Sequence, residues 1–405
     1  MRAVELFTGA GGLAMGASLA GFKPLAVVEW DRWACDTLRE NKARDYPLVS
    51  DWPVTEGDVR SFPWDSIPKD IELVAGGPPC QPFSMGGKHR AYDDSRDMFP
   101  ATVDIIRRLQ PKAFIVENVK GLTRSTFANY FEYIRLQLEF PERPARSNED
   151  WADHLRRLQQ EKTSGRLHGK GLTYKLATTL VNAANYGVPQ KRERVFMVGF
   201  RYDQGVDWSF PKETHSYDAL LHDQFVTGIY WDRHKVAKKH RPALAPQLTS
   251  KVRRLSEAKS MPTLLPWRTV RDALVGLPDP EKTMGGYRDH RFQPGAKVYP
   301  GHTGSPLDLP AKTLKAGGHG VPGGENMLVK PDGSVRYFTV RESARIQTFP
   351  DGFVFHGAWG ETMRQLGNAV PVALARVVAA SVAEQLAIAQ MAQLKNSLWA
   401  KRGAA

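Results

Sequence analysis

The sequence has 405 residues, and 56 Lys and Arg against 43 Asp and Glu give it a formal net charge of +13. The length suits one large or two modest domains, and hydrophobic residues at 41% exclude a wholly disordered chain. Charge-free apolar runs fall short of the ~18 residues that span a membrane, and two cysteines are too few for a disulfide framework. We expect a soluble cytoplasmic protein whose excess positive charge either forms a solvated surface or serves a polyanionic partner.

Short apolar runs typical of buried strands recur through the first 200 residues and alternate with helical patterns. We expect strands at residues 3–7, 25–29, 71–75, 113–117, 176–181 and 195–200, and helices at residues 13–20, 33–41 and 99–109. This alternation predicts an α/β fold with a doubly wound, mostly parallel sheet. Five of the six strands lead into unusual residues, at the edge where such sheets place their functional sites.

The remaining segments differ from this pattern. Residues 141–171 form a polar stretch, which we expect to be a surface insertion with one short helix near residues 151–162. From residue 201 the pattern is lost, and residues 233–259 carry nine Lys or Arg against one Glu. It returns at residues 339–349, and the chain closes with a helical pattern over residues 371–398.

The first motif, FTGAGGLA, follows a strand and begins a helix, with Glu29 twenty residues after Gly9. Glycines let a ligand approach the backbone, and Glu29 could accept hydrogen bonds from ribose hydroxyls. The motif is compatible with NAD, with another adenosine cofactor or with a turn required for packing alone. Asp58 could likewise accept from an adenine amino group, with Val59 on the ring, or could be a turn residue.

The second motif, GGPPCQPFS, holds Cys80 in a stiff loop directly after a strand. A cysteine fixed in this way is a candidate nucleophile, acting as its thiolate. Cys35 lies within a helical pattern and is expected to be structural.

The third motif places Glu117 directly after the apolar strand of residues 113–116. An unpaired buried carboxylate is costly, so we expect Glu117 to have a partner. The run QKRER at residues 190–194 could supply it, although it could also be an exposed loop.

Taken in order, these motifs resemble those of the DNA (cytosine-5)-methyltransferases, of bacterial or phage type. The matching runs are ELFTGAGG, VVEWD, GDV, GGPPCQPFS, ENV, QKRERVFMVG, RESARIQTFPD and RQLGNAVP. The resemblance implies that Cys80 adds to C6 of a cytosine swung out of the duplex, and that Glu117 protonates or hydrogen-bonds N3. It also implies that Arg192 and Arg194 hold the base and the carboxylate. No metal is implied.

The resemblance further implies that S-adenosylmethionine is bound and converted to S-adenosylhomocysteine. The residues that match its binding site are Phe7, Gly9, Gly11, Gly12, Glu29, Trp30, Asp58, Val59, Pro79, Asn368 and Ala369. The catalytic domain would comprise residues 1–200 and 331–405, with a target-recognition domain at residues 201–330.

Double-stranded DNA is the implied partner, and the residues expected to contact it are Gln81, Ser84, Lys238, Lys239, Arg253, Arg254 and Thr313. Residues 84–99 resemble a loop that closes over DNA. Asp97 stands where the family usually has Gly, so we expect it to stiffen that loop or alter its closure, leaving the chemistry untouched.

Three other interpretations fit part of the sequence. A nicotinamide dehydrogenase would explain Gly9 and Glu29 but leaves Cys80 and Glu117 without a role. A tRNA cytosine-5 methyltransferase shares the motifs, although the long target region favours duplex DNA. A non-catalytic relative would be expected to lose Cys80 or Glu117. We expect a monomer in a prokaryotic cytoplasm, at the nucleoid, working alone, with a restriction endonuclease or in phage defence.

Overall fold

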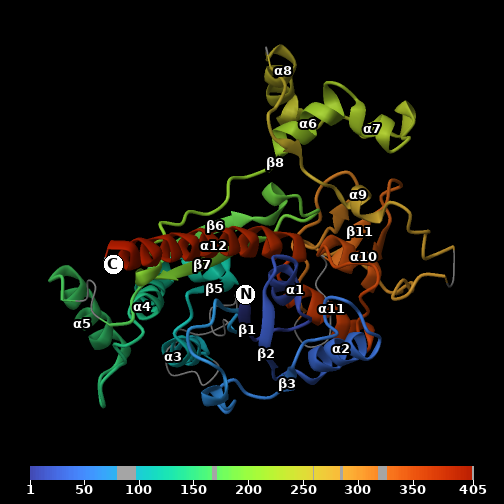
Figure 1. The fold of residues 1–405 in the computed structure, drawn as a ribbon. Coiled ribbons are helices and arrows are strands. Elements are labelled where there is room, and N and C mark those ends of the chain that lie inside the picture. The colour runs from blue at the N-terminus through green and yellow to red at the C-terminus, as the bar shows by residue number, and fades with distance from the viewer. Residues whose placement is uncertain (80–96, 167–170, 259, 283–285, 318–325, 404–405) are drawn as a thin grey trace. The chain divides into compact units, whose positions relative to one another are not determined.

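The computed structural model describes residues 1–79, 97–166, 171–258, 260–282, 286–317 and 326–403 (Figure 1). The chain forms two compact units. The first comprises Met1–Val181, Glu193–Pro211 and Ala375–Ala405, and the second comprises Asn182–Arg192 and Lys212–Leu374.

A seven-stranded sheet forms the centre of the first unit, in the strand order β3-β2-β1-β4-β5-β7-β6. Its strands are β1 (Arg2–Leu6), β2 (Lys23–Glu29), β3 (Val54–Glu56), β4 (Leu73–Gly76), β5 (Ala113–Val119), β6 (Tyr174–Asn182) and β7 (Glu193–Arg201). β1 to β5 pair in parallel, whereas β7 runs antiparallel to β5. The strand order reverses between β1 and β4, and ligands bind at such switch points, outside the carboxyl ends of the strands.

The expected α/β fold is confirmed, with all six expected strands in this sheet. The helices that follow its strands are α1 (Gly12–Leu19), α2 (Arg32–Ala43), α3 (Phe99–Leu109) and α4 (Ala128–Glu139). The parallel strands are apolar because both faces of such a sheet are covered, as the fully buried Val4, Val28 and Phe114 show. The sequence does not predict β3, since only Val54 among its three residues is apolar.

The polar stretch contains helix α5 (Trp151–Thr163), close to the predicted position. Asp150 begins it by accepting a hydrogen bond from the backbone N–H of Asp153. Its apolar face packs against α4, where the Tyr130 and Trp151 ring centroids lie 5.8 Å apart and Leu158 is fully buried. The stretch is therefore more than a surface feature, because a few apolar residues at helical spacing suffice to attach it.

The closing helix, α12 (Val372–Gly403), buries Val378, Val382 and Leu386. Its close approach to α1 requires Gly16, because a Cβ there would collide with Ala375. One stretch within Trp359–Ser397 is long and apolar enough to cross a membrane by length and composition, but half of it is buried inside the protein. A core helix passes the same test.

The second unit is built from short elements, seen in Figure 1 as α6, α7 and α8 grouped beside β8 and as α9 and α10 beside β11, with α11 packed against α10. Its strands are β8 (His215–Ser216), β9 (Leu265–Pro266), β10 (Ser305–Pro306), β11 (Met327–Val329) and β12 (Val335–Tyr337). Its helices are α6 (Tyr217–Phe225), α7 (Ile229–Arg233), α8 (Thr249–Glu257), α9 (Val270–Leu274), α10 (Val340–Ile346) and α11 (Trp359–Asn368). Elements of two to ten residues leave little periodicity in a sequence, which explains the lost pattern after residue 201.

Candidate active site

The turn between β1 and α1 has an unusual backbone. Phe7, Gly9 and Gly11 have positive φ angles of 51°, 55° and 88°. A Cβ on Gly11 would lie 3.0 Å from the Trp52 ring, so packing excludes a side chain there. A Cβ on Gly9 would meet nothing within 4 Å, so the space over this residue is open. The turn can therefore admit a ligand close to its backbone.

Glu29 closes this turn from the end of β2. Its carboxylate accepts hydrogen bonds from the backbone N–H groups of Gly9 at 2.7 Å, Trp30 at 2.9 Å and Asp31 at 2.8 Å. Burial raises its pKa, and these three hydrogen bonds oppose the rise. The backbone oxygen of Glu29 also accepts from Gly57 N–H at 2.8 Å, which brings the segment before Asp58 to the same edge.

The residues matched to an adenine site lie nearby, with one unpredicted neighbour. The Trp30 side chain is 71% exposed, as a free stacking surface requires. Val59 is buried in the core, and its carbonyl accepts from the Trp64 indole. Asp58 is engaged by Arg60, whose Nε lies 3.0 Å from both carboxylate oxygens, and this pair lowers the pKa of Asp58. An open glycine turn, an exposed indole and two carboxylates fit an adenosyl group.

A second group of residues follows β4 and β5. A Cβ on Gly76 would lie 2.8 Å from the Leu6 carbonyl, so the close pairing of β4 with β1 requires this glycine. A Cβ on Gly77 would lie 3.2 Å from Glu117 Oε2, so the carboxylate of Glu117 sits directly beside the GGPP turn. Asn118 fixes that turn by donating to the Pro78 carbonyl at 3.1 Å. The sequence motifs include Asn118 but give no sign of this bond.

Arg194 is the partner of Glu117. Because β7 is antiparallel to β5, its first residues lie beside the carboxyl end of β5, with Arg194 opposite Val119. Arg194 Nε is 2.8 Å from Glu117 Oε1, and the two side chains are only 11% and 9% exposed. Burial lowers the pKa of Arg194 and Glu117 opposes that effect, so the guanidinium stays charged. The expectation that QKRER supplies a partner for Glu117 is confirmed.

Arg192 has different contacts, within the second unit. Its guanidinium is fully buried and donates to the carbonyls of Leu314 at 3.1 Å and Gly367 at 2.8 Å. Gly367 begins the GNAVP run, and Gln347 binds the carbonyl of Ala369 in the same run at 3.1 Å. These hydrogen bonds show that Arg192 stabilises the GNAVP turn. Its catalytic role, and the cofactor contacts of Asn368 and Ala369, stay predictions.

The structure describes one of the two cysteines, Cys35, and its burial agrees with the expected structural role. Cys35 is buried, and its thiol donates to the Glu29 carbonyl at 3.3 Å. Burial, with a contribution from Glu29, raises the pKa of Cys35 to about 12, so it is not a thiolate at neutral pH. Cys80, Gln81 and Ser84 lie outside the described residues, directly after Pro79. Among the described residues, no group of three or more His, Cys, Asp or Glu could hold a metal ion.

Asp97 occupies a defined place at the start of α3. Its Oδ1 accepts from the Phe99 N–H at 3.1 Å, and the Tyr130 hydroxyl donates to its Oδ2. Asp97 thus ties α3 to α4, which packs against α5. Its effect on the preceding loop stays a prediction.

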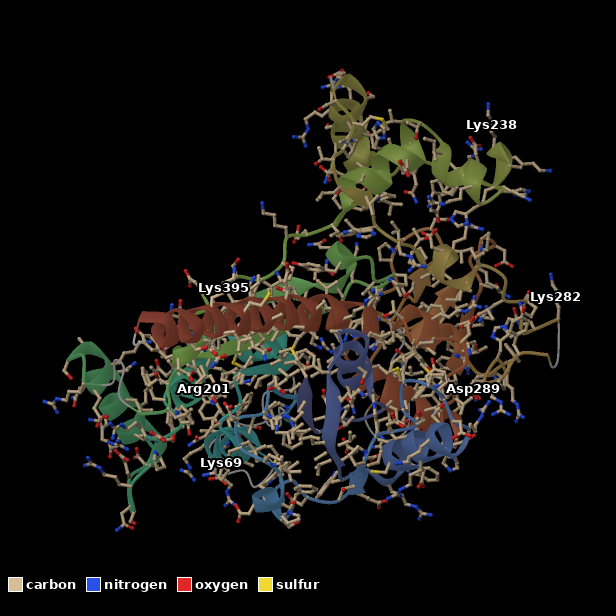
Figure 2. All side chains as sticks on the ribbon, viewed as in Figure 1. Lys69, Arg201, Lys238, Lys282, Asp289 and Lys395 are labelled. Atoms are coloured by element: carbon tan, nitrogen blue, oxygen red, sulfur yellow. The ribbon has the colours of Figure 1, made fainter. Side chains whose placement is uncertain are left out.

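Four of the five expected DNA contacts in the second unit are exposed, and the fifth, Thr313, is half-buried. Lys238 and Lys239 lie on a 3-10 turn, and Figure 2 shows Lys238 pointing away from the ribbon. Arg253 and Arg254 lie exposed on α8. The Thr313 hydroxyl donates to the Lys191 carbonyl at 2.7 Å, which fixes it beside QKRER.

Comparison with known proteins identifies the family. The family described as C-5 cytosine-specific DNA methylase matches residues 1–140 and 166–384. The chain belongs to this family. It is a DNA (cytosine-5)-methyltransferase, as the motifs predicted. Membership implies S-adenosylmethionine as the methyl donor and DNA as the substrate.

Its relatives cover nearly the whole methyltransferase. The type II methyltransferase M.PspPI of Psychrobacter sp. is 30% identical over 394 residues, covering 95% of this chain and 79% of that protein. The type II methyltransferase M.NgoMIV of Neisseria gonorrhoeae is 30% identical over 388 residues, covering 95% and 97%. A solved structure described as a DNA modification methyltransferase encoded within an E. coli prophage has a TM-score of 0.57 at 21% identity, covering 95% and 99%.

The family match also clarifies the organisation of this methyltransferase. It omits residues 141–165, which hold the whole of α5, so this stretch is an insertion relative to the family. The predicted domains are defined by role, with a catalytic domain at residues 1–200 and 331–405 and a target-recognition domain at residues 201–330. They differ from the two compact units and stay a prediction.

Proposed function

We propose that this methyltransferase modifies C5 of a flipped-out cytosine in a short, specific duplex DNA sequence, through a covalent bond between Cys80 and C6. The observation that carries the proposal is the buried Glu117–Arg194 pair beside the GGPP turn, from which the chain continues into Cys80. Glu117 is held by Arg194 beside the turn that leads directly into Cys80, the candidate thiolate. A carboxyl group in this place suits proton transfer to a ring that the thiolate attacks.

The Cys80 thiolate forms an S–C6 bond, and the C5–C6 electron pair moves through the ring as Glu117 gives or shares a proton at N3. C5 then becomes nucleophilic and accepts a methyl group. A base removes the C5 proton, the C5–C6 double bond re-forms, and Cys80 leaves as a thiolate while N3 returns its proton. Arg194 keeps Glu117 oriented throughout. None of these steps calls for a metal ion.

S-adenosylmethionine, when bound, supplies the methyl group. We propose that the open turn at Gly9 and Gly11 receives its adenosyl portion, with Glu29 at the ribose hydroxyls. Trp30 would stack on the adenine, Asp58 and Val59 would meet its edge, and Pro79 would close the pocket. Phe7 and Gly12 complete the turn, and Asn368 and Ala369 are proposed to reach the same group.

The proposed setting is a prokaryotic cytoplasm, where the enzyme acts as a monomer on double-stranded DNA. The relatives named above are type II methyltransferases, which supports a pairing with a cognate restriction endonuclease. A defence system or solitary modification would use the same chemistry. The second candidate is tRNA methylation, since the motifs alone do not distinguish the two nucleic acids.

Bisulphite sequencing tests the proposal. Plasmid DNA from a methylation-free host that expresses the wild-type chain should carry protected cytosines confined to one short motif. Cys80→Ala should abolish protection while retaining DNA binding, and the matched Cys35→Ala should retain protection, because its thiol is buried and protonated. Protection that survives Cys80→Ala would refute the assigned nucleophile. No protection in the wild type, with tRNA methylated instead, would favour the second candidate.

A further inference from the structure

A pair of aromatic rings in the second unit lies directly beyond two paired strands. β8 and β9 are parallel, with Ser216 opposite Pro266, and Trp267 N–H donates to the Ser216 carbonyl at 3.1 Å. Tyr217 and Trp267 are the next residues of these strands, so their side chains meet with ring centroids 5.1 Å apart. The Trp267 indole also donates to Asn185 Oδ1 at 2.9 Å. These contacts hold the two rings in one place.

Lys191 extends over both rings. Its Nζ lies 5.4 Å from the Tyr217 ring centroid and 5.4 Å from that of Trp267. Its backbone is fixed as well, because its N–H donates to Ala311 and its carbonyl accepts from Thr313. Within the described part of the chain, no carboxylate pairs with the Lys191 ammonium. The surrounding groups desolvate it and lower its pKa, an effect that a bound anion would oppose.

Lys251 of α8 approaches the same rings and provides a contrast. Its Nζ lies 5.2 Å from the Tyr217 ring centroid, but it also forms an ion pair with Asp218. Of the two lysines at the rings, Lys191 is therefore the one whose charge lacks a carboxylate. An ammonium positioned by aromatic faces keeps its N–H donors available, because a cation–π contact uses the charge without occupying a donor.

We propose that Lys191, positioned by Tyr217 and Trp267, binds a backbone phosphate of duplex DNA. This inference rests on the proposed function and adds a residue to its DNA-binding surface. A phosphate is favoured over a stacked base because the two rings already face each other and Lys191. The contact would carry no sequence information of its own, but would set the position of the protein on the duplex.

The test is the salt dependence of binding to a fluorescent random-sequence duplex, measured for Lys191→Met. The methionine keeps an apolar chain on the rings and removes only the charge. Losing one phosphate contact should make the slope of log association constant against log salt concentration shallower by about 0.9. That change corresponds to about eightfold weaker binding at 0.1 M salt and about fourfold weaker binding at 0.2 M. Lys69→Met, an exposed lysine of the first unit labelled in Figure 2, is the control and should change neither.

A second variant separates positioning from charge. Trp267→Leu keeps the ammonium, so it should weaken binding with little change in slope. An unchanged slope and affinity for Lys191→Met overturn the proposal. A folded wild type that binds tRNA in preference to duplex DNA, with the slope difference only on tRNA, also overturns it by assigning the contact to RNA. Bisulphite protection is scored separately, so loss of the phosphate contact and failure of the proposed reaction remain distinct results.

Discussion

Replacing Arg194 with Met should strongly destabilise the first unit, because the Glu117 carboxylate would stay buried without its guanidinium partner. The charged atoms are 2.8 Å apart and the side chains are about a tenth exposed. Removing one member of such a buried pair costs about 3–5 kcal/mol. Lys120–Glu193 is a comparable surface pair, with charged atoms 2.9 Å apart but side chains 56% and 47% exposed, and breaking it should cost ~0–1 kcal/mol. Lys120→Met is therefore the control.

The assay is the free energy of unfolding from urea titration followed by circular dichroism. Arg194→Met should lose several times more stability than Lys120→Met. The double variant Arg194→Met/Glu117→Gln should recover most of the loss, because a neutral amide needs no counter-charge. The reasoning is refuted if Arg194→Met is no worse than the control, or if the double variant is as unstable as Arg194→Met alone.

Three further predictions concern buried and exposed charges. Desolvation raises the pKa of Glu5 in the folded protein well above its usual value of 4.5. The stability that the protonated carboxyl contributes is therefore complete below about pH 4.5 and is lost as the pH rises toward the pKa of the folded state. Glu5→Gln should accordingly raise the melting temperature more at about pH 8 than at about pH 4. Tyr130→Phe should cost about 1.5–3 kcal/mol in urea unfolding, and far less in an Asp97→Ala background, since both changes break one hydrogen bond to a charged group. Neutralising four exposed basic residues should weaken duplex binding and flatten its salt dependence, and an unchanged slope would mean that they face away from DNA; they are Lys238, Lys239, Arg253 and Arg254.

The sequence predicts the strand ends that border the candidate site well, because each of their features is local. An apolar run followed by glycines, a cysteine or a carboxylate identifies a strand end, and parallel strands bring such ends to one edge. Contacts between distant residues leave no local signal. Arg60 on Asp58, Asn118 on the Pro78 carbonyl and Tyr130 on Asp97 all depend on how separate segments pack. The short elements after residue 201 escape prediction for a different reason, since they are too brief to show a period.

The run QKRER shows how the direction of one strand determines what its neighbours do. β7 enters the sheet antiparallel to β5, so Arg194, at its start, meets Glu117 near the end of β5. Two residues earlier the chain belongs to the second unit, where Arg192 binds backbone carbonyls and Lys191 lies over two rings. Substitutions at these three positions should therefore act on different properties. Substituting Arg194 should change the stability of the first unit and the charge balance at Glu117. Substituting Arg192 should change the stability of the GNAVP turn, and substituting Lys191 should change the salt dependence of DNA binding.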